Sequence, residues 1–302
     1  MKKILVTCLS AAMSLAGCRV ASGQPEVSFG TLHSYEKFPS KYVPRRTVRV
    51  WTPEGYDSSK RYDVLYMHDG QMLWDANVSW NHQEWGVDEV VSELLAAGAI
   101  RDCIVVGVDN NEKRRIGEFS PEDVSVYLKK GDTVYKKCKS RGNAYLKFLV
   151  EEVKPFVDKN FSTNTGCEST FIMGSSCGGL ISLYALCKYP EVFGGAACLS
   201  THCTFSSPSS PSPKESSIEA FLRYLADNLP ADGRHLLYMD RGDATLDAAY
   251  EGPQEKITSL IKGLQPQWSP DNFKYEFFPG AAHCEDDWRA RLDIPLSFLL
   301  GK

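Results

Sequence analysis

A serine enclosed by glycines, between a strand-like run and a helix-like run, constrains this fold more than any other feature. Residues 171–179 read Phe-Ile-Met-Gly-Ser-Ser-Cys-Gly-Gly, which places Ser176 at the centre of a Gly-x-Ser-x-Gly pentapeptide. The apolar residues before it favour a strand, and residues 180–189 have the character of a helix. Strand, strained tight turn and helix in this order are typical of a nucleophile elbow, which exposes a serine hydroxyl beside a general base. The sequence therefore predicts that Ser176 is a nucleophile.

Strand-like and helix-like runs alternate from residue 62 onward. Strands are predicted at residues 62–67, 103–108, 170–173, 194–199, 235–239 and 274–278, and helices at 87–97, 143–160, 180–189, 218–228, 250–263 and 288–300. Two earlier strands, at 27–35 and 47–52, have no helix between them. This pattern predicts an α/β fold with a mostly parallel central sheet, helices on both faces and an antiparallel N-terminal edge.

The first residues resemble a bacterial lipoprotein signal. A basic start is followed by an apolar stretch at residues 4–16 that is short for a membrane span, and then by Gly17 and Cys18. We expect a signal peptide at residues 1–17, lipid on Cys18, a tether at 18–26 and one domain at 27–302. The protein would then be anchored to the bacterial cell envelope, facing the periplasm or the cell surface. The alternative is an ordinary secretory signal that is cut a few residues later.

Composition and cysteine spacing exclude several classes of function. The formal net charge is −4 and no run of Lys or Arg stands out, so no nucleic-acid partner is expected. Eight of the ten cysteines follow Cys18, and no pair of them has the spacing of zinc ligands. We expect no metal and no cofactor. The sequence makes no prediction of oligomeric state.

A general base and an acid are available in the order that a serine nucleophile needs, which is serine, acid, histidine. His283 follows the last predicted strand, where the general base belongs. The loop after the strand at 235–239 contains Asp240, Asp243 and Asp247, and spacing alone does not decide among them. Cys284 follows His283 and Cys177 follows the serine, so a disulfide between them is conceivable, but two free thiols are the expectation.

Two backbone N–H groups are predicted to form an oxyanion hole. One belongs to Cys177, the residue after the nucleophile, and the other to Gln71, in the loop after the strand at 62–67. Gly70 would let the backbone approach closely there. His68 and Asp69 could instead be a metal pair, but no further ligand accompanies them at useful spacing.

From about residue 48 to its end, the chain resembles an esterase family of α/β-hydrolases that includes esterase D-like, enterochelin esterase-like and feruloyl or acetyl-xylan esterase-like proteins. The matching segments, in order, are 65–71, 84–88, Arg114-Arg115 with Glu118, 174–179, 199–202, 245–250 and His283. The resemblance implies an α/β-hydrolase fold and hydrolysis of carboxylic esters through a serine acyl-enzyme. It favours Asp247 as the acid, with Asp243 second.

Loop residues of aromatic and polar character are candidates for binding the substrate. They are Trp74, Trp85, Arg114, Arg115, Glu118 and His202, with Trp80 beside them. We expect an ester of an acylated carbohydrate, feruloyl or acetyl, or a related small-molecule ester at the cell envelope. A siderophore ester and acyl transfer on the same triad are alternatives. A non-catalytic binding protein with this fold is the rival from another class.

Overall fold

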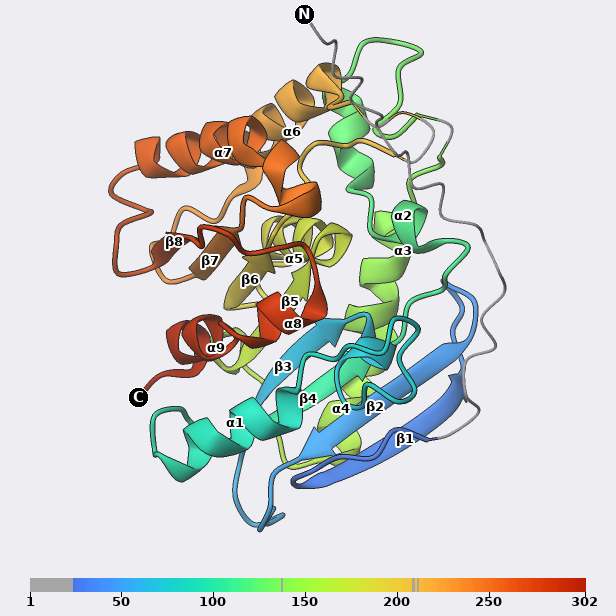
Figure 1. Ribbon diagram of the computed structural model, residues 1–302, viewed down its shortest axis with the longest axis vertical. Helices are drawn as coiled ribbons and strands as arrows, with labels where there is room; N and C mark the ends of the chain where they lie inside the picture. The colour runs from blue at the N-terminus through green and yellow to red at the C-terminus, as the bar shows by residue number, and fades with distance from the viewer. Residues whose placement is uncertain (1–23, 137, 208–209, 211) are drawn as a thin grey trace, which may run out of the picture.

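One sheet of eight strands runs through the molecule (Figure 1). The computed structural model describes residues 24–136, 138–207, 210 and 212–302, so the expected signal peptide, Cys18 and most of the tether lie outside the described residues. The strands are β1 (Thr31–Phe38), β2 (Arg46–Thr52), β3 (Asp63–His68), β4 (Cys103–Val108), β5 (Thr170–Ser175), β6 (Gly195–Leu199), β7 (Leu236–Arg241) and β8 (Phe273–Phe277).

The sheet has the strand order β1-β2-β4-β3-β5-β6-β7-β8. Strands β3 to β8 pair in parallel, whereas β1 pairs antiparallel with β2, and β2 antiparallel with β4. This arrangement confirms the predicted α/β-hydrolase fold with its antiparallel N-terminal edge. Because the parallel strands all point the same way, the loops after β3, β5, β7 and β8 meet at one edge of the sheet.

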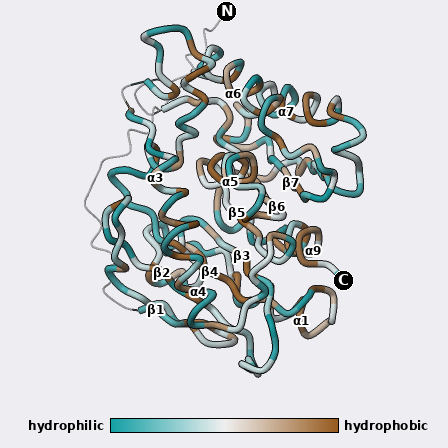
Figure 2. The backbone as a smooth tube through the Cα atoms, turned by 180° about the vertical axis from the view of Figure 1, so that it is seen from behind, coloured by the Kyte–Doolittle hydropathy of each residue, from teal (hydrophilic) through white to brown (hydrophobic). Residues whose placement is uncertain are grey.

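Helices cover both faces of the sheet. They are α1 (Val87–Ala96), α2 (Arg115–Glu118), α3 (Gly142–Lys147), α4 (Lys154–Asn160), α5 (Cys177–Lys188), α6 (Glu215–Asn228), α7 (Glu251–Gly263), α8 (Glu285–Arg289) and α9 (Asp293–Leu300). In β3, Val64 and Tyr66 pack with the cluster that includes α3 to α7, while Leu65 and Met67 pack with α1, α8 and α9. A strand buried on both faces needs this continuous apolar run. The hydrophobic colour in Figure 2 follows the central strands and α5.

Strand β1 and the helix expected at 143–160 differ from the sequence-based prediction for identifiable reasons. Strand β1 begins at Thr31 because the N–H groups of Ser28 and Phe29 bond to the Asp88 carboxylate instead of a strand, at 2.7 and 3.2 Å. The helix expected at 143–160 contains a π-helical segment, Phe148–Val153, just before Pro155. Proline has no N–H to offer a carbonyl one α-turn back, which favours this wider turn.

The C-terminal helix that the sequence predicts at residues 288–300 is two helices. Helices α8 and α9 are separated by residues 290–292. Pro295 stands in the first turn of α9, where backbone N–H groups have no partner within the helix, so its missing donor costs little. Within the described residues, no helix has both the length and the apolar character needed to cross a bilayer.

Candidate active site

Ser176 occupies a strained turn at the carboxyl end of β5. Its φ of 57° and ψ of −123° lie in a region that L-residues rarely adopt. Strand β5 ends at Ser175 and helix α5 begins at Cys177, so the serine stands alone between the two elements. A Cβ on Gly174 would lie 2.9 Å from the backbone carbon of Gly178, which explains the glycine there. The predicted elbow is therefore present in shape.

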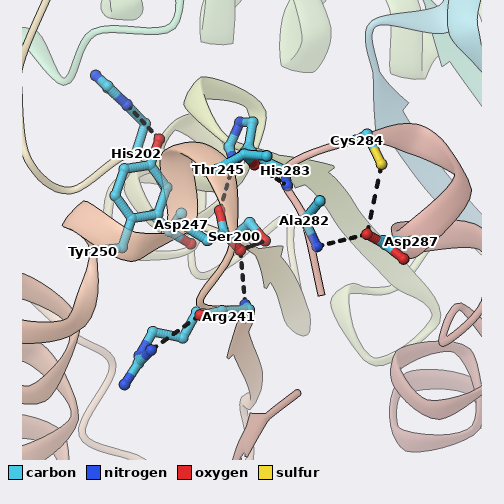
Figure 3. Close-up of polar contacts among 12 residues, drawn as sticks. Ser200, His202, Arg241, Thr245, Asp247, Tyr250, Ala282, His283, Cys284 and Asp287 are labelled. Carbon is cyan, nitrogen blue, oxygen red and sulfur yellow. Dashed lines mark hydrogen bonds and ion pairs between the residues drawn. The ribbon is translucent and has the colours of Figure 1, made fainter. Parts of the chain in front are cut away.

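Asp247 and His283 form a direct pair (Figure 3). Oδ1 of Asp247 lies 2.6 Å from Nδ1 of His283. Asp247 stands in the short 3₁₀ helix Thr245–Ala249 after β7, and His283 in the loop after β8. The backbone N–H of His283 donates to Oγ1 of Thr245 at 2.8 Å, which ties the two loops together. Among the three aspartates that spacing left open, Asp247 is the one that contacts the imidazole.

The carboxylate of Asp247 is fully buried and its second oxygen is also satisfied. Oδ2 accepts the hydroxyl of Ser200 at 2.5 Å and the N–H of Gly242 at 2.7 Å. Burial raises the pKa of Asp247, but the hydrogen bonds with His283, Ser200 and Gly242 outweigh it and hold the pKa below its ordinary value. The group is a carboxylate at neutral pH.

Ser176 and His283 line one cavity of about 880 Å³. The ring of His283 is also packed edge to face against Tyr250 and Trp288, with centroid distances of 5.5 and 4.9 Å. Among the described residues no hydrogen bond joins Ser176 to His283, and a pair of this kind often closes only when substrate is bound. The cavity thus brings the predicted nucleophile and base to one surface.

Two unused backbone donors stand at the same place. Gln71 follows β3 in the 3₁₀ turn Gly70–Met72 and lines the cavity. A Cβ on Gly70 would lie 2.7 Å from the backbone of Gly107 and Val108, so only glycine fits there. Neither the N–H of Gln71 nor that of Cys177 donates to another described residue. Both groups remain available to a developing oxyanion.

Asp69 and Arg115, which both line the cavity, form an ion pair. The Arg115 guanidinium holds the Asp69 carboxylate with two hydrogen bonds, of 2.8 and 2.7 Å. Burial raises the pKa of Asp69, but Arg115 and Asn110 lower it below its ordinary value. Burial lowers the pKa of His68 to about 3, so this ring is neutral, with Nδ1 in contact with the Tyr145 hydroxyl at 2.7 Å. The Asp69 carboxylate is therefore the ion-pair partner of Arg115.

Four of the six predicted substrate-binding residues do not line this cavity, which corrects their assignment. Trp74 is buried, with its ring against the backbone of Gly107. Arg114 is exposed, lies directly before α2, and is not among the residues that line the cavity. His202 is buried, with Nδ1 2.7 Å from the Tyr250 hydroxyl and Nε2 3.0 Å from the Ser206 carbonyl. Burial lowers its pKa to about 4.

Glu118 is the fourth predicted residue that does not line the cavity, because its side chain is buried in the core. Its carboxylate lies 2.9 Å from the Arg46 guanidinium, and both side chains are 2% exposed or less. Arg46 also stacks over the rings of Tyr145 and Phe148. Trp85 and Arg115 line the cavity as expected, joined by Trp80 and Trp288.

We expect the substitution Glu118→Gln to lower the free energy of unfolding by about 3–5 kcal/mol, because it leaves a buried arginine without its counter-charge. Urea denaturation followed by circular dichroism measures this loss. The matched control is Glu215→Gln, whose exposed pair with Lys256 should contribute little. An equally small change in both variants would contradict a structural role for Glu118.

Several residues of the site were not predicted. Ser200 and Tyr250 lie inside segments that matched the family but carry no spacing signal of their own, and Trp288 reads as a core aromatic. Asp243, the second choice of acid, is exposed and accepts the N–H of Gly280 at 2.6 Å. Cys177 and Cys284 are free thiols, like the other six described cysteines.

Metal-binding geometry is absent from the part of the chain that the structure describes. No group of three or more histidine, cysteine, aspartate or glutamate side chains there could hold an ion. The conspicuous His68-Asp69 sequence is explained by the contacts with Tyr145 and Arg115.

The chain resembles known proteins in sequence and in fold. Residues 41–295 match the profile of the protein family described as "Putative esterase". An endo-1,4-beta-xylanase/feruloyl esterase of Xylanibacter ruminicola is 27% identical over 180 residues, which is 56% of this chain and 21% of that protein. The chain spans no more than 59% of the length of three curated relatives that it matches.

Two solved structures illustrate the likeness in fold. A ferulic acid esterase of Anaeromyces mucronatus, solved in complex with ferulic acid, superposes with a TM-score of 0.62 at 19% identity, covering 92% of this chain and 93% of that one. The ferric enterobactin esterase of Salmonella typhimurium superposes with a TM-score of 0.64 at 16% identity, covering 91% of this chain and 59% of that one.

Proposed function

Because the chain belongs to this esterase family, we propose that it hydrolyses carboxylic esters through an acyl-enzyme on Ser176. The observation that carries the proposal is the buried Asp247 carboxylate bonded to Nδ1 of His283, with the imidazole lining the same cavity as Ser176. An imidazole oriented in this way presents Nε2 to a nucleophile, which is the arrangement of a Ser-His-Asp triad.

The proposed acylation begins when Nε2 of His283 takes the proton of the Ser176 hydroxyl as Oγ attacks the ester carbonyl carbon. The N–H groups of Gln71 and Cys177 bind the oxyanion that forms. The bond from this carbon to the alcohol oxygen then breaks, and the imidazolium returns its proton to the departing alcohol. Asp247 holds the required tautomer and stabilises the imidazolium.

Deacylation repeats the path with water. Nε2 of His283 takes a proton from a water molecule as its oxygen attacks the acyl carbon. The bond to Oγ breaks, the imidazolium protonates Ser176, and the carboxylic acid leaves. Acyl transfer to another alcohol would differ only in the acceptor, so product analysis with added alcohol separates the two reactions.

An acylated carbohydrate, feruloyl or acetyl, is the substrate class that the cavity supports best. Trp80 is 63% exposed and lines the cavity with Trp85 and Trp288, and flat aromatic rings of this kind stack on sugars or aromatic acids. Glu112 and Glu285 also line it, and neither forms an ion pair with a described residue. Negative side chains disfavour an anionic iron chelate and suit a neutral glycan.

A siderophore ester remains the second candidate, because the ferric enterobactin esterase shares the fold. A panel of p-nitrophenyl acyl esters, feruloyl and acetyl oligosaccharides and a catecholate siderophore ester separates the candidates. Release of the acid from the oligosaccharides, with no cleavage of the siderophore, supports the carbohydrate. The reverse outcome supports the siderophore. We place the reaction at the bacterial cell envelope on the strength of the signal-like first residues and Cys18.

The substitution Trp80→Ala tests the carbohydrate directly. We expect KM for an acylated oligosaccharide to rise about fivefold to tenfold, because a stacking surface for the sugar is lost. Turnover of p-nitrophenyl acetate, which has no sugar, should change by less than about twofold.

The matched control is Phe29→Ala, which removes an aromatic ring that is 42% exposed away from the cavity. An equal change in KM for both substrates in Trp80→Ala, or no change for either, would contradict a sugar-binding role for Trp80.

A further inference from the structure

Behind the Asp247 carboxylate lies a buried polar network that the proposed reaction does not use directly. Its centre is the hydroxyl of Ser200, which follows β6. This oxygen accepts a hydrogen bond from Nε1 of Trp288 at 3.1 Å and another from Nη2 of Arg291 at 3.0 Å. Its own O–H donates to Oδ2 of Asp247 at 2.5 Å (Figure 3). A hydroxyl has one proton and two lone pairs, so two incoming donors commit its proton to Asp247.

The donor Arg291 is itself held in place. Nε and Nη2 of Arg291 bond to the two carboxylate oxygens of Asp240 at 3.1 and 3.0 Å, and both side chains are buried. The guanidinium also lies over the ring of Phe278, 4.7 Å from its centre. A bidentate pair of this kind fixes geometry as well as balancing charge. Nη2 of Arg291 therefore meets the Ser200 oxygen from a fixed direction.

Ser200 is fixed through its backbone too. Its N–H donates to Asp240, at 3.0 Å from Oδ1 and 3.1 Å from the main-chain oxygen. Its φ of 41° lies in the left-handed region, which costs energy for a serine and persists only where the surroundings hold it. Trp288 joins the network to the base, because its ring also packs edge to face against His283.

We propose that Ser200, held by Arg291 and Trp288, is a positioning residue that aims the Asp247 carboxylate at His283. The inference rests on the proposed function and adds a role for a residue that is hydrogen-bonded to Asp247 but not to His283 or Ser176. With Oδ2 held by Ser200 and Gly242, rotation of the carboxylate is blocked, and Oδ1 stays directed at Nδ1 of His283. Without Ser200 the carboxylate has one donor fewer and turns more freely.

The variants Ser200→Gly and Ser200→Ala test the proposal. Glycine suits the positive φ and alanine keeps the side-chain volume, so failure to fold in one does not stop the experiment. We expect kcat for p-nitrophenyl acetate to fall about tenfold to a hundredfold, as for a lost hydrogen bond to a charged group, with KM within about twofold. Thermal denaturation confirms that the variants are folded at the assay temperature.

The matched control is Ser217→Ala. Ser217 is equally buried, and its hydroxyl also accepts from a cation, Lys214, and donates to an oxygen, the Val134 carbonyl. It stands in α6, outside the cavity lining. Its loss should lower stability without changing kcat. A fall in kcat as large as that of the Ser200 variants would show that both act only through stability.

A double-variant cycle gives the decisive readout, because a residue that acts through Asp247 has no effect once Asp247 is gone. In the Asp247→Ala background, which leaves no side-chain oxygen for Ser200 to orient, adding Ser200→Ala should change kcat by less than about twofold. The same fall in both backgrounds would overturn the proposal, as would a Ser200→Ala enzyme with unchanged kcat. If instead Asp247→Ala itself has wild-type activity, or the wild type cleaves no ester, the proposed function is what fails.

Discussion

Replacing Ser176 by alanine is expected to lower kcat for ester hydrolysis by about four to six orders of magnitude, because the substitution removes the hydroxyl on which the proposed acyl-enzyme forms. The rate should fall to the level set by the oxyanion donors and substrate binding alone. The fold should be unaffected, since alanine lacks one oxygen and meets the same φ of 57° as the serine. Hydrolysis of p-nitrophenyl acetate, followed at 25 °C with purified wild type and variant, measures the difference.

Covalent labelling distinguishes a lost nucleophile from a damaged enzyme. A fluorophosphonate should modify the wild type at Ser176 and leave Ser176→Ala unlabelled, while both proteins melt at similar temperatures. Ser217→Ala, which changes a buried serine outside the cavity lining, should label normally. Wild-type turnover in Ser176→Ala would end the assignment, and an unreactive wild type would favour a binding protein with this fold.

Replacing Asp247 by asparagine should lower kcat by about three to four orders of magnitude. Oδ2 receives hydrogen bonds from Ser200 and Gly242, so the amide oxygen of asparagine must take that position. The amide NH₂ then faces Nδ1 of His283, and Nδ1 has to accept instead of donating. The imidazole proton moves to Nε2, which can no longer receive a proton from Ser176. Steady-state kinetics on the same ester measures the loss.

The neighbouring aspartate is the control for this experiment. Asp243 is exposed, and among the described residues its carboxylate accepts a hydrogen bond only from the N–H of Gly280. The substitution Asp243→Asn removes the same charge four residues away and should leave kcat within about twofold. If Asp243→Asn caused the large loss of kcat and Asp247→Asn the small one, the catalytic acid would be Asp243, which the resemblance ranked second.

The choice among the three aspartates shows where sequence reasoning ends. All three lie at or after the carboxyl end of β7, where a parallel sheet delivers the acid to the edge that carries the nucleophile. Which one reaches the histidine depends on the path of the loop. Asp240 is still in the strand and pairs with Arg291, Asp243 caps a turn, and Asp247 is carried inward by a 3₁₀ helix. The spacing of the three aspartates along the chain gives no information about these contacts.

Two of the predicted substrate-binding residues, Trp74 and Glu118, were misassigned for a related reason. Both lie in segments whose sequence is typical of a polar loop, where a tryptophan or a carboxylate suggests an open cleft, yet each is buried by a partner distant in sequence. The partner of Trp74 is the backbone of Gly107, and that of Glu118 is Arg46. Residue type indicates what a side chain can bind. It does not indicate whether another part of the chain has already bound it.

Local pattern alone was sufficient for the layered architecture, the elbow around Ser176 and the position of His283 after the last strand. These features follow from short-range rules, because strands, helices and tight turns are encoded by the period of apolar residues and by glycines over a few positions. The aim of the Asp247 carboxylate, the network behind it and the lining of the cavity depended on contacts between segments far apart in the chain. Those contacts exist only after the sheet has brought the loops of β3, β5, β6, β7 and β8 together.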